Sequence, residues 1–138
     1  MTDPALIGIV VVSHSARLAE GVVEMAGQMA GPDQPLIGVG GSPDGGLGTD
    51  TERIADAIRR ADGGSGVVVI GDLGSAILAT DAALELLEPE LAARVRISGG
   101  PIVEGAVIAA VQASIGESLD DVLRAAESAR DLDKGVGR

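Results

Sequence analysis

The sequence contains no cysteine, phenylalanine, tyrosine or tryptophan. Without cysteine the chain has no disulfide, no thiol nucleophile and no thiolate metal site. This absence does not indicate one cellular compartment over another. Without aromatic rings there is no platform on which a nucleobase, a sugar face or a flavin could stack. The composition therefore excludes several common kinds of catalytic and binding site.

Basic residues are also scarce, because ten Lys and Arg stand against 21 Asp and Glu, which gives a formal net charge of −11. Nucleic acids and anionic membranes both attract basic surfaces, so we expect neither as a partner. No apolar run reaches the roughly 20 residues of a membrane-spanning helix, and the N-terminus lacks the basic start of a secretory signal. We therefore expect a cytoplasmic protein whose partners present basic or neutral surfaces.

The length of 138 residues, 46% of them apolar, suits one domain built on Val, Ile, Leu and Ala. We expect a single domain over residues 1–138 with its core between about 6 and 130. Strand and helix patterns alternate, which predicts a parallel sheet covered on both faces. The expected strands are residues 6–12, 36–39, 66–70 and 95–97, and the expected helices are residues 15–30, 50–61, 75–87, 102–115 and a last one capped by Ser118.

This alternation predicts an α/β three-layer sandwich with a doubly wound, mainly parallel four-stranded sheet in the order 2-1-3-4. In that order the first and third strands are neighbours at the switch point, where such sheets bind ligands. His14, the one histidine, follows the first strand, and Asp72 follows the third. We therefore expect these two side chains to lie close together at the carboxyl edge of the sheet.

A carboxylate beside a histidine suggests a specific chemistry. If Asp72 accepts a hydrogen bond from one ring nitrogen of His14, it fixes the tautomer and leaves the lone pair of the other nitrogen exposed. Histidine can then attack phosphorus and form a phosphohistidine. No serine lies in a Gly-x-Ser-x-Gly elbow, so no second nucleophile is indicated. The alternative is a structural, hydrogen-bonded histidine.

A phosphoryl group on His14 needs hydrogen-bond donors around it. Backbone N–H groups after His14 and in the turn at residues 71–76 are candidates, although an ordinary capped connection from strand to helix is the alternative for that turn. We expect the phosphate to be contacted by Ser13, Ser15, Gly74 and Ser75.

The glycine-rich segment at residues 40–48 is not a P-loop, because no Lys-Ser or Lys-Thr pair follows its last glycine. We expect a flexible rim that a partner orders. Glu104, near the end of the fourth strand, is either a rim residue or a charge that favours a helix N-terminus. The carboxylates lack ligand spacing for zinc, so we expect no metal. The expected rim residues are Gly40, Gly41, Thr49 and Glu104.

Four motifs, taken together and in this order, resemble the phosphotransfer subunits of bacterial dihydroxyacetone kinases. These subunits belong to the mannose-type enzyme IIA group of the phosphoenolpyruvate-dependent phosphotransferase system. The similarity extends over about residues 6–130, and the motifs are residues 11–22, 48–49, 72–76 and 101–106. The resemblance implies the mannose-type enzyme IIA fold and a phosphotransferase component, a phosphoenolpyruvate–glycerone phosphotransferase.

In that family a histidine is phosphorylated by the carrier protein HPr. It passes the phosphoryl group to ADP held on the nucleotide-binding kinase subunit, where dihydroxyacetone is phosphorylated. His14 matches the phosphorylated histidine, and Asp72 matches the carboxylate that orients it. The resemblance also implies a homodimer and a transient phosphohistidine without a tightly bound cofactor. Some relatives continue into HPr-like and enzyme I-like domains, so we expect separate donors for this chain.

Two departures from the sugar-transporting members favour the dihydroxyacetone branch. Ser15 follows His14 where those members usually have glycine, and Leu73-Gly74-Ser75 replaces a turn that contains threonine. An enzyme IIA of a mannose-type sugar permease and a phosphorylation-controlled regulatory module are the alternatives. The apolar helix at residues 103–111 fits either the interior or a subunit interface.

Overall fold

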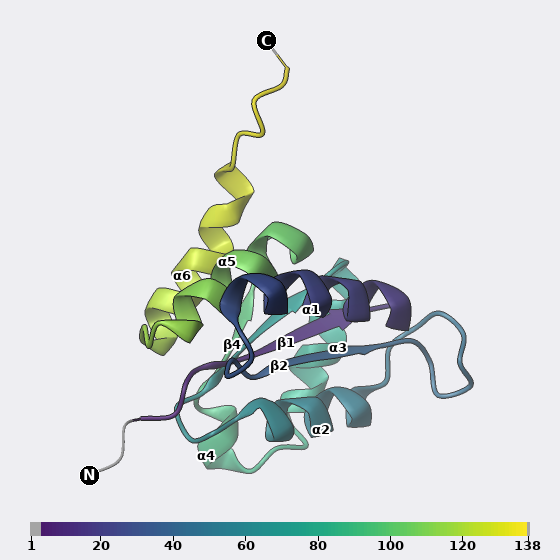
Figure 1. Cartoon of the computed structure of the whole chain (residues 1–138). Coiled ribbons are helices and arrows are strands. Elements are labelled where there is room, and N and C mark those ends of the chain that lie inside the picture. The colour runs from purple at the N-terminus through teal and green to yellow at the C-terminus, as the bar shows by residue number, and fades with distance from the viewer. Residues whose placement is uncertain (1–3, 138) are drawn as a thin grey trace.

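The sheet has four parallel strands, with the order β2-β1-β3-β4 (Figure 1). The structure, a computed structural model, describes residues 4–137, so residues 1–3 and 138 of the expected domain lie outside the described residues. This architecture confirms the expected α/β fold and strand order. The strands are β1 (Gly8–Ser13), β2 (Leu36–Gly40), β3 (Val67–Gly71) and β4 (Val95–Ser98).

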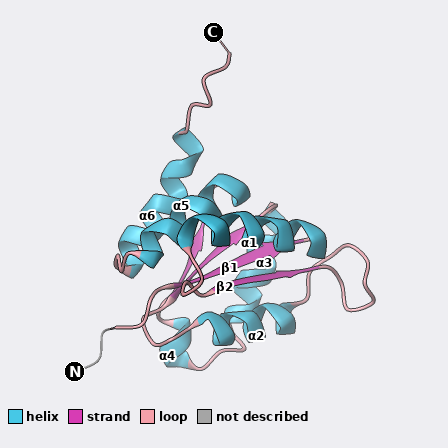
Figure 2. Cartoon of the chain, in the orientation of Figure 1, coloured by secondary structure: helices cyan, strands magenta, loops and turns pink. Residues whose placement is uncertain are grey.

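Helices cover both faces of the sheet and complete a three-layer sandwich (Figure 2). On one face lie α1 (Ala16–Ala30), α5 (Ile102–Ser114) and α6 (Leu119–Ser128), which a short 3-10 turn, η1 (Ala129–Asp131), follows. On the other face lie α2 (Thr51–Ala61), α3 (Gly74–Leu84) and the short α4 (Pro89–Ala92).

Alternate residues of β1 supply the two halves of the core. Val10 and Val12 pack toward α2 and α3, whereas Ile9 and Val11 pack toward α1, α5 and α6. Because successive side chains of a strand point to opposite faces, a strand between two helical layers is apolar at every position. All six residues of β1 are buried, and His14 directly follows the carboxyl end of this strand.

One side of the apolar helix α5 packs into the interior of the chain. It lies between α1 and α6 and against the sheet, and its buried side is made of small residues. Small residues allow the three helices and the sheet to approach closely. The buried side of α5 therefore belongs to the interior, whereas a subunit interface on its half-buried side stays a prediction; the buried residues are Gly105, Ala106, Ala109, Ala110 and Ala113.

The expected helix at residues 75–87 is shorter in the structure and is followed by a second one. α3 begins at Gly74 and ends at Leu84, and α4 begins at Pro89 after a turn. Pro89 cannot donate a backbone hydrogen bond and disfavours a helical conformation at Glu88, but it suits the first position of a new helix. No helix within residues 4–137 is long and apolar enough to cross a membrane.

Gly8 and Gly21 provide a matched test of packing. A Cβ at Gly8 would lie 2.2 Å from the carbonyl oxygen of Ala61, whereas a Cβ at Gly21, within α1, would meet nothing within 4 Å. We expect Gly8→Ala to lower the free energy of unfolding by about 1–3 kcal/mol, and Gly21→Ala to raise it by about 0.5–1 kcal/mol. Urea unfolding measures both, and a Gly8→Ala protein as stable as the parent would contradict this packing.

Candidate active site

His14 lies between the end of β1 and the start of α1, on the edge where the parallel strands end. The next residue, Ser15, has an extended backbone and caps α1, because its hydroxyl accepts a hydrogen bond from the N–H of Leu18 at 3.2 Å. In the neighbouring strand Asp72 directly follows β3, and its N–H donates to the carbonyl of Val12. The pairing of β1 with β3 therefore brings His14 and Asp72 together, as the strand order predicts.

The carboxylate of Asp72 accepts four hydrogen bonds and so is held rigidly. Oδ1 accepts from Nδ1 of His14 at 2.9 Å and from the N–H of Leu73 at 2.8 Å. Oδ2 accepts from the hydroxyl of Ser13 and from the N–H of His14, both at 2.9 Å. The ring and the backbone of His14 are thus both anchored to the same carboxylate.

Asp72 is kept ionised by its donors. Burial raises the pKa of this carboxyl, but the hydrogen bonds from the backbone and the ring of His14 and from Ser13 lower it by more. The net result is a pKa below the ordinary value. At neutral pH Asp72 is therefore an acceptor only, and a neutral His14 ring carries its proton on Nδ1.

The other ring nitrogen, Nε2, is the free nucleophilic position. Its one hydrogen-bond partner among residues 4–137 is the hydroxyl of Ser75, at 2.7 Å. When Nδ1 carries the proton, Nε2 presents a lone pair and the hydroxyl donates to it. A quarter of the His14 side chain is exposed, so a partner molecule can reach this nitrogen.

The start of α3 faces this nitrogen without a capping side chain. Its N-cap residue is Leu73, which makes no side-chain hydrogen bond to the helix. Within the described part of the chain, the N–H groups of Gly74 and Ser75 have no acceptor. Open N–H groups at a helix N-terminus form a ready anion site, and here they lie beside Nε2. The turn is therefore not an ordinary capped connection.

Ser13 lies deeper in the fold than the sequence predicts. We expected it to contact phosphate, but its side chain is fully buried, its hydroxyl donates to Asp72 and it accepts from the N–H of Ser15. Ser13 thus positions the carboxylate. Ser15 is half-buried as the cap of α1, whereas Gly74 and Ser75 are exposed; phosphate contact by these three stays a prediction.

Two of the expected rim residues, Gly40 and Gly41, are buried in the fold, yet both line a hollow beside the glycine-rich loop, and their role as rim residues stays a prediction. A Cβ at Gly40 would lie 2.7 Å from the carbonyl oxygens of Ser13 and Ser15, so glycine there allows β2 to pack against the start of α1. Thr49 is half-buried and follows Gly48, whose N–H donates to the carbonyl of His14 at 2.8 Å.

Glu104 lies in the first turn of α5 and ion-pairs with Lys134 at 2.5 Å. The Lys134 partner lowers the pKa of this carboxyl. Its position agrees with a charge that favours a helix N-terminus, and its role as a rim residue stays a prediction. Among residues 4–137 no group of three or more His, Asp or Glu is placed to hold a metal ion.

Leu47 and Arg17, close to His14 in the fold's loops or in sequence, were not singled out from the sequence, and Leu73 was expected only as part of the turn after Asp72. Leu47 and Leu73 are strongly exposed, and Arg17 extends from the first turn of α1. A signal for each is present in the sequence: a leucine within a run of glycines, a leucine at a helix-start position that usually carries Ser, Thr or Asp, and a cation where helices favour anions.

The chain is similar to known proteins over most of its length. Residues 8–123 match the EIIA-man family, "PTS system fructose IIA component". The phosphoryl donor subunit DhaM of the PEP-dependent dihydroxyacetone kinase 2 of Listeria innocua is 42% identical over 119 residues, which cover 86% of this chain and 95% of that protein. The DhaM subunit of Escherichia coli is 41% identical over 121 residues, and this chain spans only 26% of it.

Two solved structures share the fold of this chain. The crystal structure of a protein of unknown function, 34% identical, superposes with a TM-score of 0.83 and covers 96% of this chain and 99% of that one. A sigma-54 interaction domain protein from Enterococcus faecalis, 15% identical with a TM-score of 0.69, covers 94% of this chain and 93% of that one and shares the fold alone. The sequence match and the fold together establish that this chain belongs to the mannose-type enzyme IIA family, EIIA-man, of the phosphotransferase system.

Proposed function

We propose that this chain is the phosphoryl donor subunit of a phosphoenolpyruvate-dependent dihydroxyacetone kinase. It accepts a phosphoryl group from phospho-HPr on His14 and passes it to ADP on the nucleotide-binding kinase subunit. The observation that carries the proposal is the 2.9 Å contact between Nδ1 of His14 and Asp72, which leaves Nε2 facing the open start of α3. The names of the DhaM relatives support a dihydroxyacetone kinase as the enzyme that receives the phosphoryl group.

In the charging step, Nε2 of His14 attacks the phosphorus of the donor phosphohistidine. A new N–P bond forms, the N–P bond on the donor breaks, and the donor ring takes the electron pair. Phosphorylation of Nε2 while Nδ1 keeps its proton leaves positive charge on the ring. The ionised Asp72, 2.9 Å from Nδ1, stabilises that charge and holds the ring in line.

The phosphoryl group is then held at the start of α3. The N–H groups of Gly74 and Ser75 and the positive end of the helix dipole favour its negative oxygens. In the uncharged protein the Ser75 hydroxyl donates to Nε2, and on charging it rotates to donate to a phosphoryl oxygen. These contacts replace water around the phosphate without the reorganisation that a flexible site needs.

Discharge reverses the chemistry onto the acceptor. A terminal oxygen of the ADP β-phosphate attacks the phosphorus, the bond to Nε2 breaks, and the ring of His14 recovers its lone pair with the proton still on Nδ1. Asp72 therefore acts as an ionised carboxylate in both steps. The chain returns to its starting form after each transfer, as a carrier requires.

Exposed leucines on both sides of His14 suit a site that docks on other proteins. Leu73 follows Asp72 and is 61% exposed, and Leu47, 80% exposed, precedes the glycine whose N–H bonds to the carbonyl of His14. Apolar anchors around an accessible reactive group are typical of protein interfaces. We propose that they contact the donor and acceptor proteins in turn.

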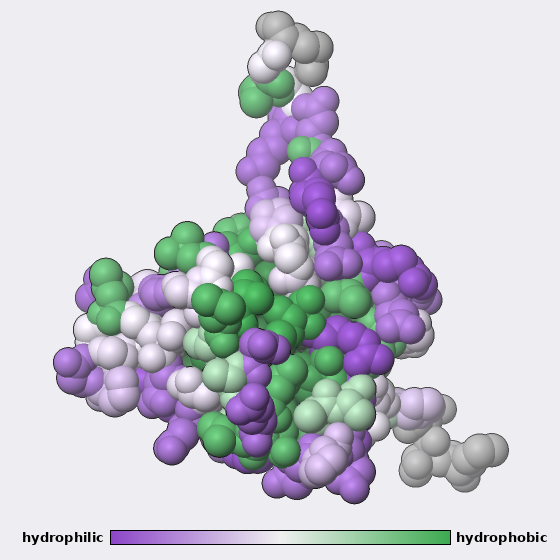
Figure 3. Space-filling model, turned by 180° about the vertical axis from the view of Figure 1, so that it is seen from behind, coloured by the Kyte–Doolittle hydropathy of each residue, from purple (hydrophilic) through white to green (hydrophobic). Residues whose placement is uncertain are grey.

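The homodimer and the cytoplasmic location belong to this proposal too. Figure 3 shows apolar side chains gathered in the middle of the face opposite to the view of Figure 1. Contiguous exposed apolar surface favours association with another protein surface, and it supports a dimer. Sedimentation equilibrium of the purified chain tests the dimer.

A two-stage transfer assay tests the proposed function. The protein is incubated with phosphoenolpyruvate, enzyme I and HPr, and intact mass and acid lability report phosphohistidine. ADP-loaded kinase subunits and dihydroxyacetone are then added. We expect one acid-labile phosphoryl group that disappears as dihydroxyacetone phosphate forms. A stable charged form that the kinase subunits do not discharge would contradict the client and favour a sugar permease or a regulator, and no charging by an active donor would contradict the carrier role.

A further inference from the structure

The two peptide units that flank the Cα of His14 are held by different parts of the chain. In the first unit, the N–H of His14 donates to Oδ2 of Asp72 at 2.9 Å. In the second unit, the N–H of Ser15 donates to the hydroxyl of Ser13 at 3.0 Å, and that hydroxyl donates in turn to Asp72. The carbonyl of the second unit, that of His14 itself, accepts a hydrogen bond from the N–H of Gly48 at 2.8 Å. Gly48 thus supplies a contact to His14 that does not depend on Asp72.

These contacts determine both backbone angles of His14. Peptide units are planar, so the chain at one residue turns only about φ and ψ. Asp72 fixes the unit before the Cα, and Gly48 fixes the orientation of the unit after it. The side chain leaves from the same Cα, and its Nε2 lies 2.7 Å from the hydroxyl of Ser75. A displacement of Gly48 would therefore turn Nε2 away from the start of α3.

The contact requires glycine at position 48. The φ of Gly48 is +142°, a backbone conformation that residues other than glycine rarely adopt. A Cβ there would also lie 3.3 Å from the Cβ of Ser42, closer than ordinary van der Waals contact. A side chain at this position would strain the backbone and move the N–H that faces His14.

The glycine-rich loop that leads to Gly48 is braced by its own hydrogen bonds. The N–H of Ser42 donates to the carbonyl of Gly46 at 2.9 Å, and the N–H of Gly45 donates to the carbonyl of Ser42 at 3.0 Å. The carboxylate of Asp44 accepts from the N–H of Gly46 at 3.1 Å and from the hydroxyl of Ser42. The loop therefore presents Gly48 from a defined position.

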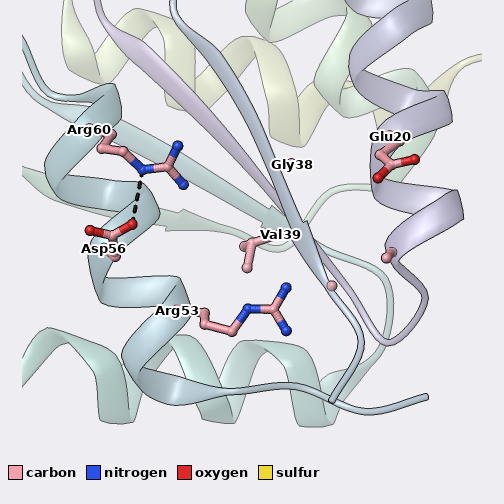
Figure 4. A pocket seen from close by; sticks show the side chains of 8 residues that line it. Glu20, Gly38, Val39, Arg53, Asp56 and Arg60 are labelled. Atoms are coloured by element: carbon pink, nitrogen blue, oxygen red, sulfur yellow. Dashed lines mark hydrogen bonds and ion pairs between the residues drawn. The ribbon is translucent and has the colours of Figure 1, made fainter. Parts of the chain in front are cut away.

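The other end of this loop is tied to α2. Figure 4 shows Arg53 reaching from α2 toward the end of β2, where the loop begins. Its Nη1 donates to the carbonyl of Gly41 at 3.4 Å, and Gly41 itself has a φ of +82°. The loop is therefore held at its start by Arg53 and at its end by the hydrogen bond from Gly48 to His14.

We propose that Gly48 is a positioning residue for phosphoryl transfer, because its N–H holds the carbonyl of His14 and so directs Nε2 toward the start of α3. The inference rests on the proposed function, in which Nε2 carries the phosphoryl group. Gly48 touches no phosphoryl group in this role and acts through the backbone of His14. Transfer rates are sensitive to a misplacement of the reacting atoms by about 1 Å. Charging and discharge use the same nitrogen in the same place, so both depend on this contact.

Transfer kinetics of Gly48→Ala in the full chain test the positioning role. Rates of charging by phospho-HPr and of discharge to the ADP-loaded kinase subunit are measured over a range of partner concentrations. We expect the maximal rates of both steps to fall about ten- to a hundredfold. We expect the partner concentrations for half-maximal rate to change much less, because Gly48 positions the reacting nitrogen and not the partner.

Gly45→Ala is the matched control, because it places the same methyl group in the same loop. The φ of Gly45 is also positive, at +92°, a Cβ there would meet nothing within 4 Å, and its N–H bonds within the loop. Urea unfolding checks that both variants are folded, and we expect maximal transfer rates close to those of the parent from Gly45→Ala alone.

The two variants distinguish the possible roles of the loop. Equal maximal rates for Gly48→Ala and Gly45→Ala would overturn the proposal. A change in Gly48→Ala that is confined to the half-maximal concentrations would also overturn it, because the loop would then act in docking. A parent that an active donor does not charge would overturn the proposed function itself, and this proposal with it.

A backbone ester separates the loss of the N–H from strain in the backbone. An ester in place of the peptide bond between Leu47 and Gly48, introduced into the full chain by chemical ligation, removes this N–H and keeps glycine. We expect the maximal rates of both steps to fall as in Gly48→Ala, and we expect parental rates from the corresponding ester before Gly45. Parental rates from the ester before Gly48 would overturn the role of its N–H.

The amide signals of Gly74 and Ser75 report the direction of Nε2. In protein labelled with ¹⁵N, we expect charging to shift both signals in the parent and in Gly45→Ala, and to shift them clearly less in Gly48→Ala. A loop with a structural role alone would leave these shifts the same in all three proteins, and that result would overturn the proposal.

Discussion

Replacing His14 with glutamine is expected to abolish phosphoryl acceptance, with a loss on the order of 10⁴-fold or more. Glutamine offers an amide nitrogen without a nucleophilic lone pair, so no N–P bond can form. The fold should persist, because the backbone N–H of residue 14 still donates to Asp72 and β1 still pairs with β3. The measurement is intact mass after incubation with an excess of phospho-HPr.

Circular dichroism and urea unfolding of the same His14→Gln preparation provide its control. A folded variant that stays uncharged supports the assignment of His14 as the nucleophile. A folded variant that still gains one phosphoryl group would show that another residue accepts it, and would make His14 a structural histidine held by Asp72.

Asp72→Asn is the second change with a large expected effect, a decrease of about 10²–10⁴-fold in the rate of charging. The amide cannot accept all four hydrogen bonds that the carboxylate now accepts, because one of its two polar atoms is a donor. The ring of His14 loses the acceptor that keeps the proton on Nδ1 and the charge that stabilises the phosphorylated ring. Rapid-quench kinetics with phospho-HPr measure the rate.

Asp62→Asn is the matched control for this change. Asp62 is also a mostly buried carboxylate, held by Arg94 at 2.6 Å, but it follows α2 at the opposite end of β3 from Asp72. We expect Asp62→Asn to lower stability and to leave the charging rate close to that of the parent. If both variants charge equally fast, Asp72 has a structural role only.

Lowering the pH should decrease the contribution of Asp72 to the stability of the folded state. The pKa of Asp72 is lower in the folded protein than its ordinary value near 4, so its ionised form stabilises the folded state above that value. This stabilisation is lost as the pH falls through the lowered pKa, when the carboxyl is protonated. We expect the stability advantage of the parent over Asp72→Asn, measured by urea unfolding, to be larger at pH 6 than at pH 3. An advantage that is the same at both pH values would contradict the ionised state of Asp72.

The parts of this site that lie at the ends of buried strands could be predicted from the sequence. The apolar runs that form β1 and β3 are continuous, because both faces of these strands are covered, and this makes their order and their carboxyl ends recognisable. The proximity of His14 and Asp72 follows from that order alone. The two helices were expected to begin at residues 15 and 50, within one residue of their starts at Ala16 and Thr51, where Ser15 and Asp50 are the caps.

The parts that depend on packing could not be predicted in the same way. Whether Ser13 faces solvent or Asp72 depends on the twist and register of two strands, and local sequence does not specify these. Gly40 resembles a loop glycine, yet it is required where β2 approaches the start of α1. The open start of α3 arises because Leu73 provides no cap, a feature that becomes informative only once Nε2 of His14 is found beside it.

The nitrogen that carries the phosphoryl group tests the account most directly. Protein labelled with ¹⁵N is charged by phospho-HPr, and long-range ¹H–¹⁵N correlations of the His14 ring are recorded before and after charging, with the ³¹P coupling to identify the bonded nitrogen. The account predicts phosphorus on Nε2 and a proton on Nδ1, where Asp72 accepts it at 2.9 Å. Phosphorus on Nδ1, or a phosphoryl group on another residue, would contradict it.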